Sequence, residues 1–329
     1  MTTERPDVSA ISVTYRSAGW IEGALASAAA GATEAGLTIE LIVVDNASDD
    51  GSADLVEAAF PSARVLRNST NVGFGAANNQ AFELARGRWW LLLNPDARVE
   101  PGALRTLVGT LEPEDALAVV APSVRTPGTF GAENAGMLPG IRSLLGHFLF
   151  LNRLPGTDRA GAWRGWMLRP QGPTGGRGEV EWASGAVLLA RPEAVRSIGG
   201  FDASIFMYGE DIDLCARLLD AGWRIGLQPA ARGSHAIGVS APETSTRWVD
   251  GLDAYLARRG APRWRRAICL LVVSLGLAIR GIDLGSRSTD PAAVVHRRRM
   301  RRGSKRALAL TLGARRVSDP GPRGWPSAS

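Results

Sequence analysis

The chain has 329 residues, of which 45% are hydrophobic and 21% are charged, with two cysteines, Cys215 and Cys269. This composition is that of a globular protein with a substantial core, and it excludes a largely disordered chain, a collagen-like repeat and a small disulfide scaffold. Two cysteines are too few for a zinc cluster and favour a reducing, cytoplasmic setting. At roughly 150 residues per domain, the length corresponds to about two domains.

The net charge of +6 is unevenly distributed along the chain. Residues 258–329 contain 17 Lys and Arg against 3 Asp and Glu, whereas the first 257 residues have more acidic than basic side chains. A basic tail behind an acidic body predicts an anionic partner for the tail, either lipid or nucleic acid. The acidic body argues against nucleic-acid binding by the main domain.

Strand-like and helix-like segments alternate through the first hundred residues. Strands are expected at 10–15, 40–45, 63–66 and 89–93, and helices lie between them at 20–30, 53–60 and 75–86. This alternation predicts an α/β fold with a mainly parallel central sheet flanked by helices. Polar residues follow two of the strands, at Asp45-Asn46 and Asn94-Pro95-Asp96. Ligands bind at the carboxyl ends of parallel strands, so both clusters are expected to face one crevice.

The second half of the body is less regular. Residues 126–178 are rich in Gly, Pro and Arg and are interpreted as an insertion, either a lid or acceptor-side surface or a long variable loop. Strands are expected again at 180–190 and 223–227, with helices at 192–197 and 211–221. We therefore expect one domain over residues 1–257 and a separate tail over 258–329.

The tail combines an apolar run with arginine clusters. Ala267–Ile279 is apolar over 13 residues and is flanked by arginines, whereas a helix that spans a bilayer needs about 20 residues. We predict a helix at about 264–281 that lies in the interface of an anionic membrane, followed by a disordered basic segment. The alternative is a core helix followed by a solvated tail. The N-terminus shows no apolar segment of a secretory signal.

Five segments carry a family resemblance, in the order SVTYRSA, IVVDNASDDGS, NSTNVGFGAANNQA, WWLLLNPDARV and the long block from Gly199 to Ser240 that contains GEDIDLCARLLDAGW. Together they resemble the family 2 glycosyltransferases, and most of all bacterial rhamnosyltransferases of cell-wall and polysaccharide assembly. The resemblance extends over about residues 8–240. It implies a GT-A fold, here followed by the helical tail, and a nucleotide-diphosphate sugar as donor.

The resemblance assigns the donor site and the metal site. It implies that the nucleotide sugar contacts Thr14, Tyr15, Asp45, Asn46, Gly73, Asn78, Asn94 and Asp96. Asp45 corresponds to the carboxylate that accepts a hydrogen bond from the base, although a turn or capping role is the alternative. Asn94-Pro95-Asp96 matches the position of the DXD motif, which implies Mg²⁺ or Mn²⁺ beside the diphosphate. Because Asn94 replaces the first Asp of the motif, the resemblance implies that Asp96 and His235, which follows the last strand, coordinate the metal.

The resemblance also places the catalytic and acceptor residues. Glu210 and Asp211 fall at the catalytic position, with Asp211 favoured as the base that takes the acceptor proton. Acidic residues that merely stabilise a helix N-terminus are the alternative. Asp213 is expected to pair with Arg217. Trp182 and Ser184 are candidate acceptor-binding residues, although Trp182 is equally compatible with a core position.

The combined prediction is an inverting, metal-dependent glycosyltransferase. It would move a sugar, L-rhamnose from dTDP-rhamnose by resemblance, to a hydroxyl of a lipid-linked or cell-wall glycan. It would lie at the inner face of the bacterial plasma membrane, with its basic tail on anionic lipid and without nucleic-acid partners. Alternatives are another donor sugar (galactose, GlcNAc or mannose), nucleotidyl transfer, or a degenerate membrane-associated glycan-binding scaffold, for which Asn94 is the only support.

Overall fold

The computed structural model describes residues 5–125, 135–153, 165–168, 178–236, 246–281 and 291–314. The chain divides into two compact units. The first comprises residues 1–135, 169–240 and 320–329, and the second comprises 136–168 and 241–319. This division differs from the boundary expected at residue 257, because part of the expected insertion belongs with the C-terminal helices.

The first unit contains the sheet. Its elements are β1 (Val8–Thr14), α1 (Ile21–Ala35), β2 (Ile39–Asp45), α2 (Ser52–Ala59), β3 (Arg64–Arg67), α3 (Phe74–Leu84), β4 (Trp89–Leu93), β5 (Ala97–Val99), α4 (Ala103–Leu111), β6 (Leu117–Arg125), β8 (Gly178–Val180), β9 (Trp182–Ala183), β10 (Val187–Ala190), α6 (Pro192–Ser197), α7 (Glu210–Asp220) and β11 (Arg224–His235). The chain leaves this unit at the short strand β7 (Ala135–Gly136).

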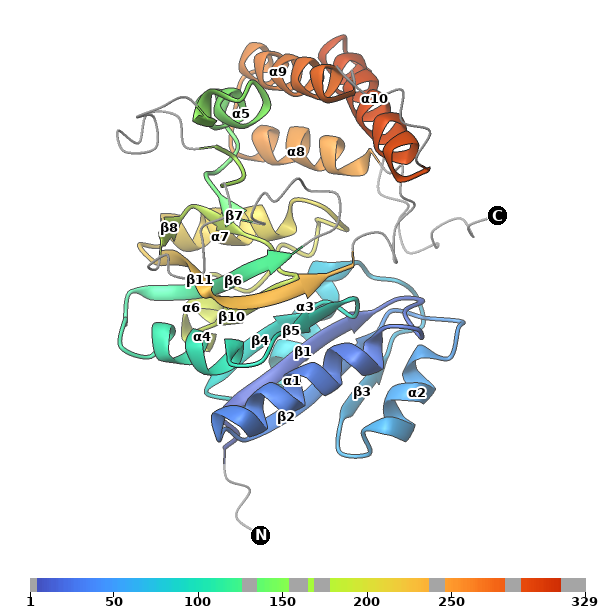
Figure 1. Ribbon diagram of the computed structural model, residues 1–329, viewed down its shortest axis with the longest axis vertical. Helices are drawn as coiled ribbons and strands as arrows, with labels where there is room; N and C mark the ends of the chain where they lie inside the picture. Colours follow the sequence, from blue (N-terminus) through green and yellow to red (C-terminus); the bar gives the residue numbers. More distant parts are fainter. Residues whose placement is uncertain are drawn as a thin grey trace. The chain divides into compact units, whose positions relative to one another are not determined.

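The strand order is β3-β2-β1-β4-β10-β6-β11-β5, with β8 also paired to β11 (Figure 1). The first four strands are parallel, as are β6 and β11, whereas β10 runs antiparallel between β4 and β6. The predicted α/β fold with a mostly parallel sheet is therefore confirmed. The first four strands and the first three helices also lie close to their predicted bounds.

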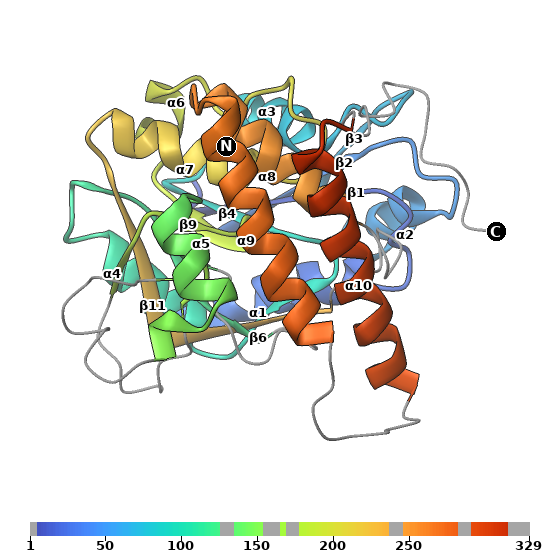
Figure 2. The same ribbon diagram turned by 90° about the horizontal axis from the view of Figure 1, so that it is seen from above.

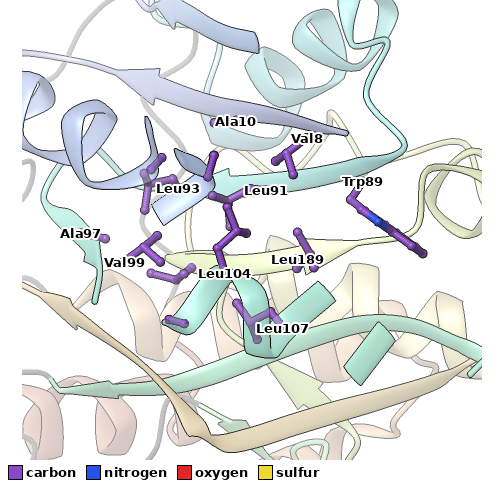
Figure 3. Close-up of a cluster of buried hydrophobic side chains, with 14 of the residues drawn as sticks. Val8, Ala10, Trp89, Leu91, Leu93, Ala97, Val99, Leu104, Leu107 and Leu189 are labelled. Carbon is purple, nitrogen blue, oxygen red and sulfur yellow. The ribbon is translucent and has the colours of Figure 1, made fainter. Parts of the chain in front are cut away.

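Both faces of the sheet are covered, because its central strands are apolar on both sides. Helices α1, α2 and α4 cover one face, where Leu91 of β4 and Leu104 and Leu107 of α4 belong to one fully buried cluster (Figure 3). On the opposite face, the ring of Trp90 stacks on Phe82 of α3 at 4.5 Å between centroids. Successive strand residues point to opposite faces, so Trp89 and Trp90 of β4 pack into the cores on the two faces of the sheet.

Strand pairing brings the ends of distant segments together. Thr14, the last residue of β1, lies opposite Asp45, the last residue of β2. The long strand β11 pairs with β6 and then, at its end, with β5, so that His235 lies opposite Ala97. Because β5 follows the Asn94-Pro95-Asp96 turn directly, this pairing places His235 beside that turn.

The second unit is helical and contains α5 (Ile141–Phe148), the short 3₁₀ helix η1 (Leu151–Arg153), α8 (Arg247–Arg258), α9 (Arg263–Gly281) and α10 (Pro291–Thr311). The helix predicted at about 264–281 corresponds to α9. Residues beyond it were expected to be disordered, but 291–311 form a helix, because Ala307 and Leu310 are buried and Arg306 pairs with Asp250. Among the described helices, none is long and apolar enough to cross a membrane.

Candidate active site

Two buried polar atoms at the ends of β1 and β2 have no hydrogen-bond partner within the described part of the chain. They are Oγ1 of Thr14 and Oδ1 of Asp45. The other carboxylate oxygen of Asp45 accepts a hydrogen bond from the Ser48 backbone at 3.0 Å. A buried carboxylate oxygen left unsatisfied is costly, so a ligand that donates a hydrogen bond fits here. Asp45 thus combines the turn role with an oxygen open to a ligand.

The loops after β1 and β2 are joined by several hydrogen bonds. The Ser17 backbone donates to Ser52 Oγ and the Ala18 backbone donates to Asp50, each at 2.9 Å. The Arg16 guanidinium makes two 2.7 Å bonds to the carboxylate of Asp49. Gly51 holds the N-cap position of α2, and Ser52, its first residue, connects the two loops through its hydroxyl group.

Backbone strain gathers around the same loops. Arg16 and Ala47 have φ values of 53° and 63°, and Tyr208, just before α7, has a φ of 69°. Residues other than glycine adopt this left-handed region at a cost of about 1–3 kcal/mol, and such residues cluster at functional sites. Arg16 and Ala47 thus add strain to the loops after β1 and β2, whereas Phe150, the remaining described non-glycine residue with a positive φ, lies in the second unit.

Three of the residues predicted to contact the nucleotide sugar, Asn46, Gly73 and Asn78, shape the start of α3 and the loop before it. Asn46 Nδ2 donates to the Gly73 carbonyl at 3.2 Å, and Asn78 Nδ2 donates to the Phe74 carbonyl at 2.9 Å. Gly73 has a φ of 91°, and a Cβ there would lie 2.6 Å from the Phe206 carbonyl oxygen. Both asparagine side chains satisfy backbone carbonyl groups, and their contacts with the nucleotide sugar stay a prediction.

The Asn94-Pro95-Asp96 turn meets the end of β11. Oδ1 of Asp96 lies 3.0 Å from Nε2 of His235, and Nδ2 of Asn94 lies 3.4 Å from the same nitrogen. Asn94 Oδ1 and His235 Nδ1 are buried, and neither has a hydrogen-bond partner among the described residues. The Ala236 backbone donates to the Asp96 carbonyl at 3.0 Å, which fixes the approach of the two segments.

This donor set fits a divalent cation that is shared with a ligand. Mg²⁺ binds its ligands at about 2.1 Å in octahedral geometry, so two ligands at right angles are about 3.0 Å apart. The Asp96 and His235 atoms are 3.0 Å apart, the distance of a direct hydrogen bond, which is also compatible with two adjacent ligands of one cation. Within the described ranges no group of three His, Cys, Asp or Glu residues could hold a metal ion. Asp96 and His235 would therefore need further oxygen ligands, such as those of a diphosphate.

The carboxylate block forms the first turn of α7. Glu210 and Asp213 are buried, and Asp213 accepts a 2.7 Å hydrogen bond from Nε of Arg217, the predicted partner four residues on. A second nitrogen of Arg217 donates to the Ile198 carbonyl at 2.9 Å. Asp213 is thus engaged in a structural ion pair, which leaves Glu210 and Asp211 as candidates for chemistry.

Burial raises the pKa of the Asp211 carboxyl group. Hydrogen bonds from the backbones of Ile212 and Gly185 and from the Ser184 hydroxyl act in the opposite direction and favour the ionised form. A carboxylate with a raised pKa is a better proton acceptor than an exposed one, because its conjugate acid is weaker. Asp211 therefore has the properties of a general base.

The loop between β9 and β10 connects the carboxylate block to the turn after β4. Ser184 and Gly185 hydrogen-bond to Asp211, and the carbonyl of the next residue, Ala186, accepts a bond from the Asn94 backbone at 2.9 Å. Ser184, predicted to bind the acceptor, thus contacts the candidate base. Trp182 is 5% exposed, so its ring offers little surface to a sugar and fits the alternative core role.

The importance of Gly185 and Ala186 was not anticipated from the sequence. The one available signal was the run of small residues between two apolar strands, where backbones can approach closely. A Cβ at Gly185 would lie 3.4 Å from the ring of Phe74, the first residue of α3, which follows Gly73. All five sequence segments are therefore connected: Asp211, Asn94 and Phe74 border this loop, and Asn46 joins Gly73 to the paired ends of β1 and β2.

Comparison with known proteins identifies the family of this arrangement. A sequence profile described as Glycosyl transferase family 2 matches residues 9–170, and one described as Glycosyl transferase family group 2 matches residues 150–290. The chain is 29% identical to the N-acetylglucosaminyl-diphospho-decaprenol L-rhamnosyltransferase of Mycobacterium tuberculosis. That alignment covers 92% of this chain and 97% of the relative.

Solved structures show the same fold. A mannosyltransferase from Pyrobaculum calidifontis, in complex with GDP-Man and Mn²⁺, aligns with a TM-score of 0.58 at 18% identity and covers 94% of this chain and 87% of its own. The GalNAc-T7 structure with UDP, GalNAc and Mn²⁺ aligns with a TM-score of 0.54 at 14% identity, covering 78% and 51%. At these identities the likeness establishes the GT-A fold.

Proposed function

Since the chain belongs to the family 2 glycosyltransferases, we propose that it is an inverting, metal-dependent enzyme that transfers L-rhamnose from dTDP-rhamnose to a hydroxyl of a lipid-linked or cell-wall glycan. The rhamnosyl donor and the lipid-linked acceptor are supported by the M. tuberculosis relative, which is named for both and aligns over nearly its whole length. Glycosyl transfer itself follows from the family.

One observation carries the mechanism. The β9–β10 loop binds the candidate base Asp211 through Ser184 and Gly185, and it binds the Asn94 turn through Ala186. The candidate base and the turn that contains Asp96 thus both contact one short loop. A transferase needs this combination, because the acceptor must be activated while the leaving diphosphate is stabilised.

The donor's nucleotide would occupy the ends of β1 and β2. Asp45 Oδ1 accepts a hydrogen bond from a ring N–H of the base, which satisfies an oxygen that is otherwise buried without a donor. Thr14 Oγ1 lies beside it in the strand register. Asp96 and His235 would hold Mg²⁺ or Mn²⁺, whose charge offsets that of the diphosphate.

Asp211 performs the proton transfer. Its carboxylate accepts the proton of the acceptor hydroxyl as the oxygen of that hydroxyl forms a bond to the anomeric carbon. The bond from that carbon to the diphosphate oxygen breaks on the opposite face, and its electron pair leaves with the nucleoside diphosphate. Attack opposite to the leaving group inverts the anomeric configuration. Ser184 and Gly185 orient the carboxylate for this step.

The location proposed for the enzyme is the inner face of the bacterial plasma membrane. A polyprenyl-linked acceptor resides in the bilayer, so an enzyme that uses one must work at its surface. The arginine-rich helices α9 and α10 would supply attraction to anionic lipid.

A donor screen on the purified chain tests the proposal. Release of nucleoside diphosphate is followed with dTDP-rhamnose, UDP-galactose, UDP-GlcNAc and GDP-mannose, each with Mn²⁺ and with EDTA, and with membrane extract as acceptor source. We expect metal-dependent turnover of dTDP-rhamnose. Turnover of another donor instead would show that the transferred sugar differs from L-rhamnose, while the proposed mechanism would stand. No turnover and no binding of any donor would overturn the proposal in favour of a scaffold.

A further inference from the structure

Helix α9 exposes a line of large apolar side chains. Trp264 is 64% exposed and Leu275 is 53% exposed, and the line consists of Trp264, Ile268, Leu271, Leu275 and Ile279. At about 100° per residue, these spacings place the five side chains within a sector of about 80°. The opposite side of the helix is buried, with Cys269 and Val273 inaccessible to solvent. The exposed line is therefore a continuous stripe along α9.

Both α9 and α10 are fastened to α8 by buried ion pairs. Arg266 of α9 binds the carboxylate of Asp253 at 2.8 and 2.7 Å, and Arg306 of α10 binds that of Asp250, with Nε 3.0 Å from Oδ2. Asp250 and Asp253 both lie on α8 and are buried. The two helices thus rest on the same support.

The position of these arginines fixes the direction of the apolar residues. Arg266 is two residues from Trp264, and Arg306 is two residues from Leu308, which is 44% exposed. Two residues correspond to about 200° around a helix, so each apolar residue points away from the arginine that faces α8. The exposed apolar residues of α9 and α10 therefore lie on one side of the second unit, opposite α8.

The two helices pack antiparallel (Figure 2). Ser274 Oγ donates to the Ser304 carbonyl at 3.0 Å, and Gly281 lies beside Arg301. This pairing places Leu308 and Leu312 of α10 level with Leu271 and Ile268 of α9. We call the combined surface the apolar platform; it consists of Trp264, Ile268, Leu271, Leu275, Ile279, Leu308 and Leu312.

Basic side chains surround the apolar platform. Together α9 and α10 contain eleven Lys and Arg and no Asp or Glu. The exposed ones are Arg263, Arg265, Arg298, Arg301, Arg302 and Lys305. An apolar surface on two helices whose charged side chains are all cationic matches the layers of an anionic membrane, with acyl chains inside and negative headgroups outside. A soluble protein partner would instead call for a polar rim of mixed sign.

We propose that the apolar platform is the surface through which this protein binds an anionic bilayer, with α9 and α10 lying in the plane of the interface. Trp264 and the leucines enter the boundary between headgroups and acyl chains, and the arginines contact the headgroups. This inference deepens the membrane location given under Proposed function. It is independent of the sugar transferred, because it assigns lipid contact to residues far in sequence from the catalytic motifs.

Flotation of the full-length protein with vesicles tests the proposal without any substrate. We expect binding to vesicles of phosphatidylglycerol and phosphatidylcholine, and a loss of at least tenfold in binding for the double variant L271E/L275E. The matched control is Leu55→Glu, which changes an equally exposed leucine of α2 and should bind as the parent does. The variant R298Q/R301Q/R302Q should lose the preference for anionic over neutral vesicles. Thermal melting confirms that each variant is folded.

A second measurement identifies the residues in contact with lipid. Brominated lipids should quench part of the tryptophan fluorescence of the parent protein, and Trp264→Phe should remove that part. Equal flotation of L271E/L275E and the parent would overturn the proposal. So would a lipid-free dimer that L271E/L275E converts to monomer while the parent does not bind vesicles. Absent flotation with donor turnover retained would reject the platform alone, whereas flotation without turnover would reject only the proposed catalysis.

Discussion

Oδ1 of Asp96 lies 3.0 Å from Nε2 of His235, although the two residues are far apart in the sequence. The contact depends on β5, a strand of three residues that follows the Asn94 turn and pairs antiparallel with the end of β11. The turn and the histidine are thus fixed by backbone pairing before any ligand arrives. Preorganisation of this kind lowers the cost of binding a cation and a diphosphate.

Asp96→Asn and His235→Ala should each weaken metal-dependent turnover. We expect a loss of more than about 100-fold at low Mn²⁺ concentration, because even partners that only orient metal ligands are worth about 10–100-fold. Turnover measured against Mn²⁺ concentration checks this. Asp115→Asn, at an exposed carboxylate outside the site, is the control. An unchanged Mn²⁺ requirement in both variants would remove the pair from the metal site.

Asp211→Asn should abolish most of the transfer while leaving donor binding intact. General base catalysis contributes about 10²–10⁴-fold, and the amide keeps the size of the side chain but accepts no proton. The measurements are kcat and the Kd of the nucleoside diphosphate. A variant with full kcat would exclude Asp211 as the base and direct attention to Glu210.

The same substitution should stabilise the protein at neutral pH. Burial raises the pKa of Asp211 in the folded state, so the folded protein holds its proton at pH values where the unfolded chain has lost it. Stability then falls as pH rises from the unfolded pKa to the folded pKa. Removing the charge by Asp211→Asn should raise Tm at pH 7 and have little effect at pH 3. Equal Tm shifts at both values would contradict this.

Asp45→Asn should weaken donor binding without affecting the metal requirement. The asparagine keeps an acceptor for Ser48 but presents a less basic oxygen or an NH₂ group to the base of the nucleotide. A hydrogen bond to a charged group is worth about 1.5–3 kcal/mol, which corresponds to roughly 10–100-fold in Kd. Calorimetry with the nucleoside diphosphate measures it. Asp54→Asn, at an exposed carboxylate of α2, should change nothing.

Gly73→Ala should destabilise the fold more than Gly36→Ala does. Both glycines have positive φ, but a Cβ at Gly73 would lie 2.6 Å from the Phe206 carbonyl, whereas one at Gly36 has no atom within 4 Å. Gly36→Ala therefore measures the cost of the left-handed helical conformation alone, about 1 kcal/mol, whereas Gly73, at φ 91° and ψ 168°, lies in a region that other residues hardly adopt. We expect chemical denaturation to show at least twice that loss for Gly73→Ala. Equal losses would mean that the Phe206 segment moves aside freely.

Local patterns in the sequence were sufficient to predict several features. The five apolar residues Trp89–Leu93 predicted β4 with its observed bounds, because strands buried on both faces tend to be continuous apolar runs. The four-residue spacing of Asp213 and Arg217 predicted their ion pair. The strand-end motifs also anticipated that the Asn94 turn lies at the carboxyl edge of the sheet.

Features that depend on tertiary contact were not predictable. Ser184 has no local feature that marks it as a partner of Asp211, since the two meet through packing of β9 against α7. Residues 291–311 are too polar on average to be recognised as a packed helix, and α10 is stabilised by the buried Ala307 and Leu310 and by the pairing of Arg306 with Asp250. The strained backbone of Arg16 and Ala47 is imposed by neighbouring loops and leaves no trace in residue type.

The register of β11 against β6 shifts between Gln228 and Arg232, and this shift constrains how many residues the strand must have there. Gln228 pairs with Pro122 of β6 and Arg232 with the next residue, Ser123, so the three residues between them have no counterpart on the partner strand. Side chains alternate along a strand, so deleting one of these three residues would turn His235 to the other face of the sheet. Ala230 is exposed and can be replaced with little consequence for the site, whereas Pro229 and Ala231 are buried, and the number of residues in the segment is fixed. Among homologues, we expect gaps to be absent from this segment even where its residues differ.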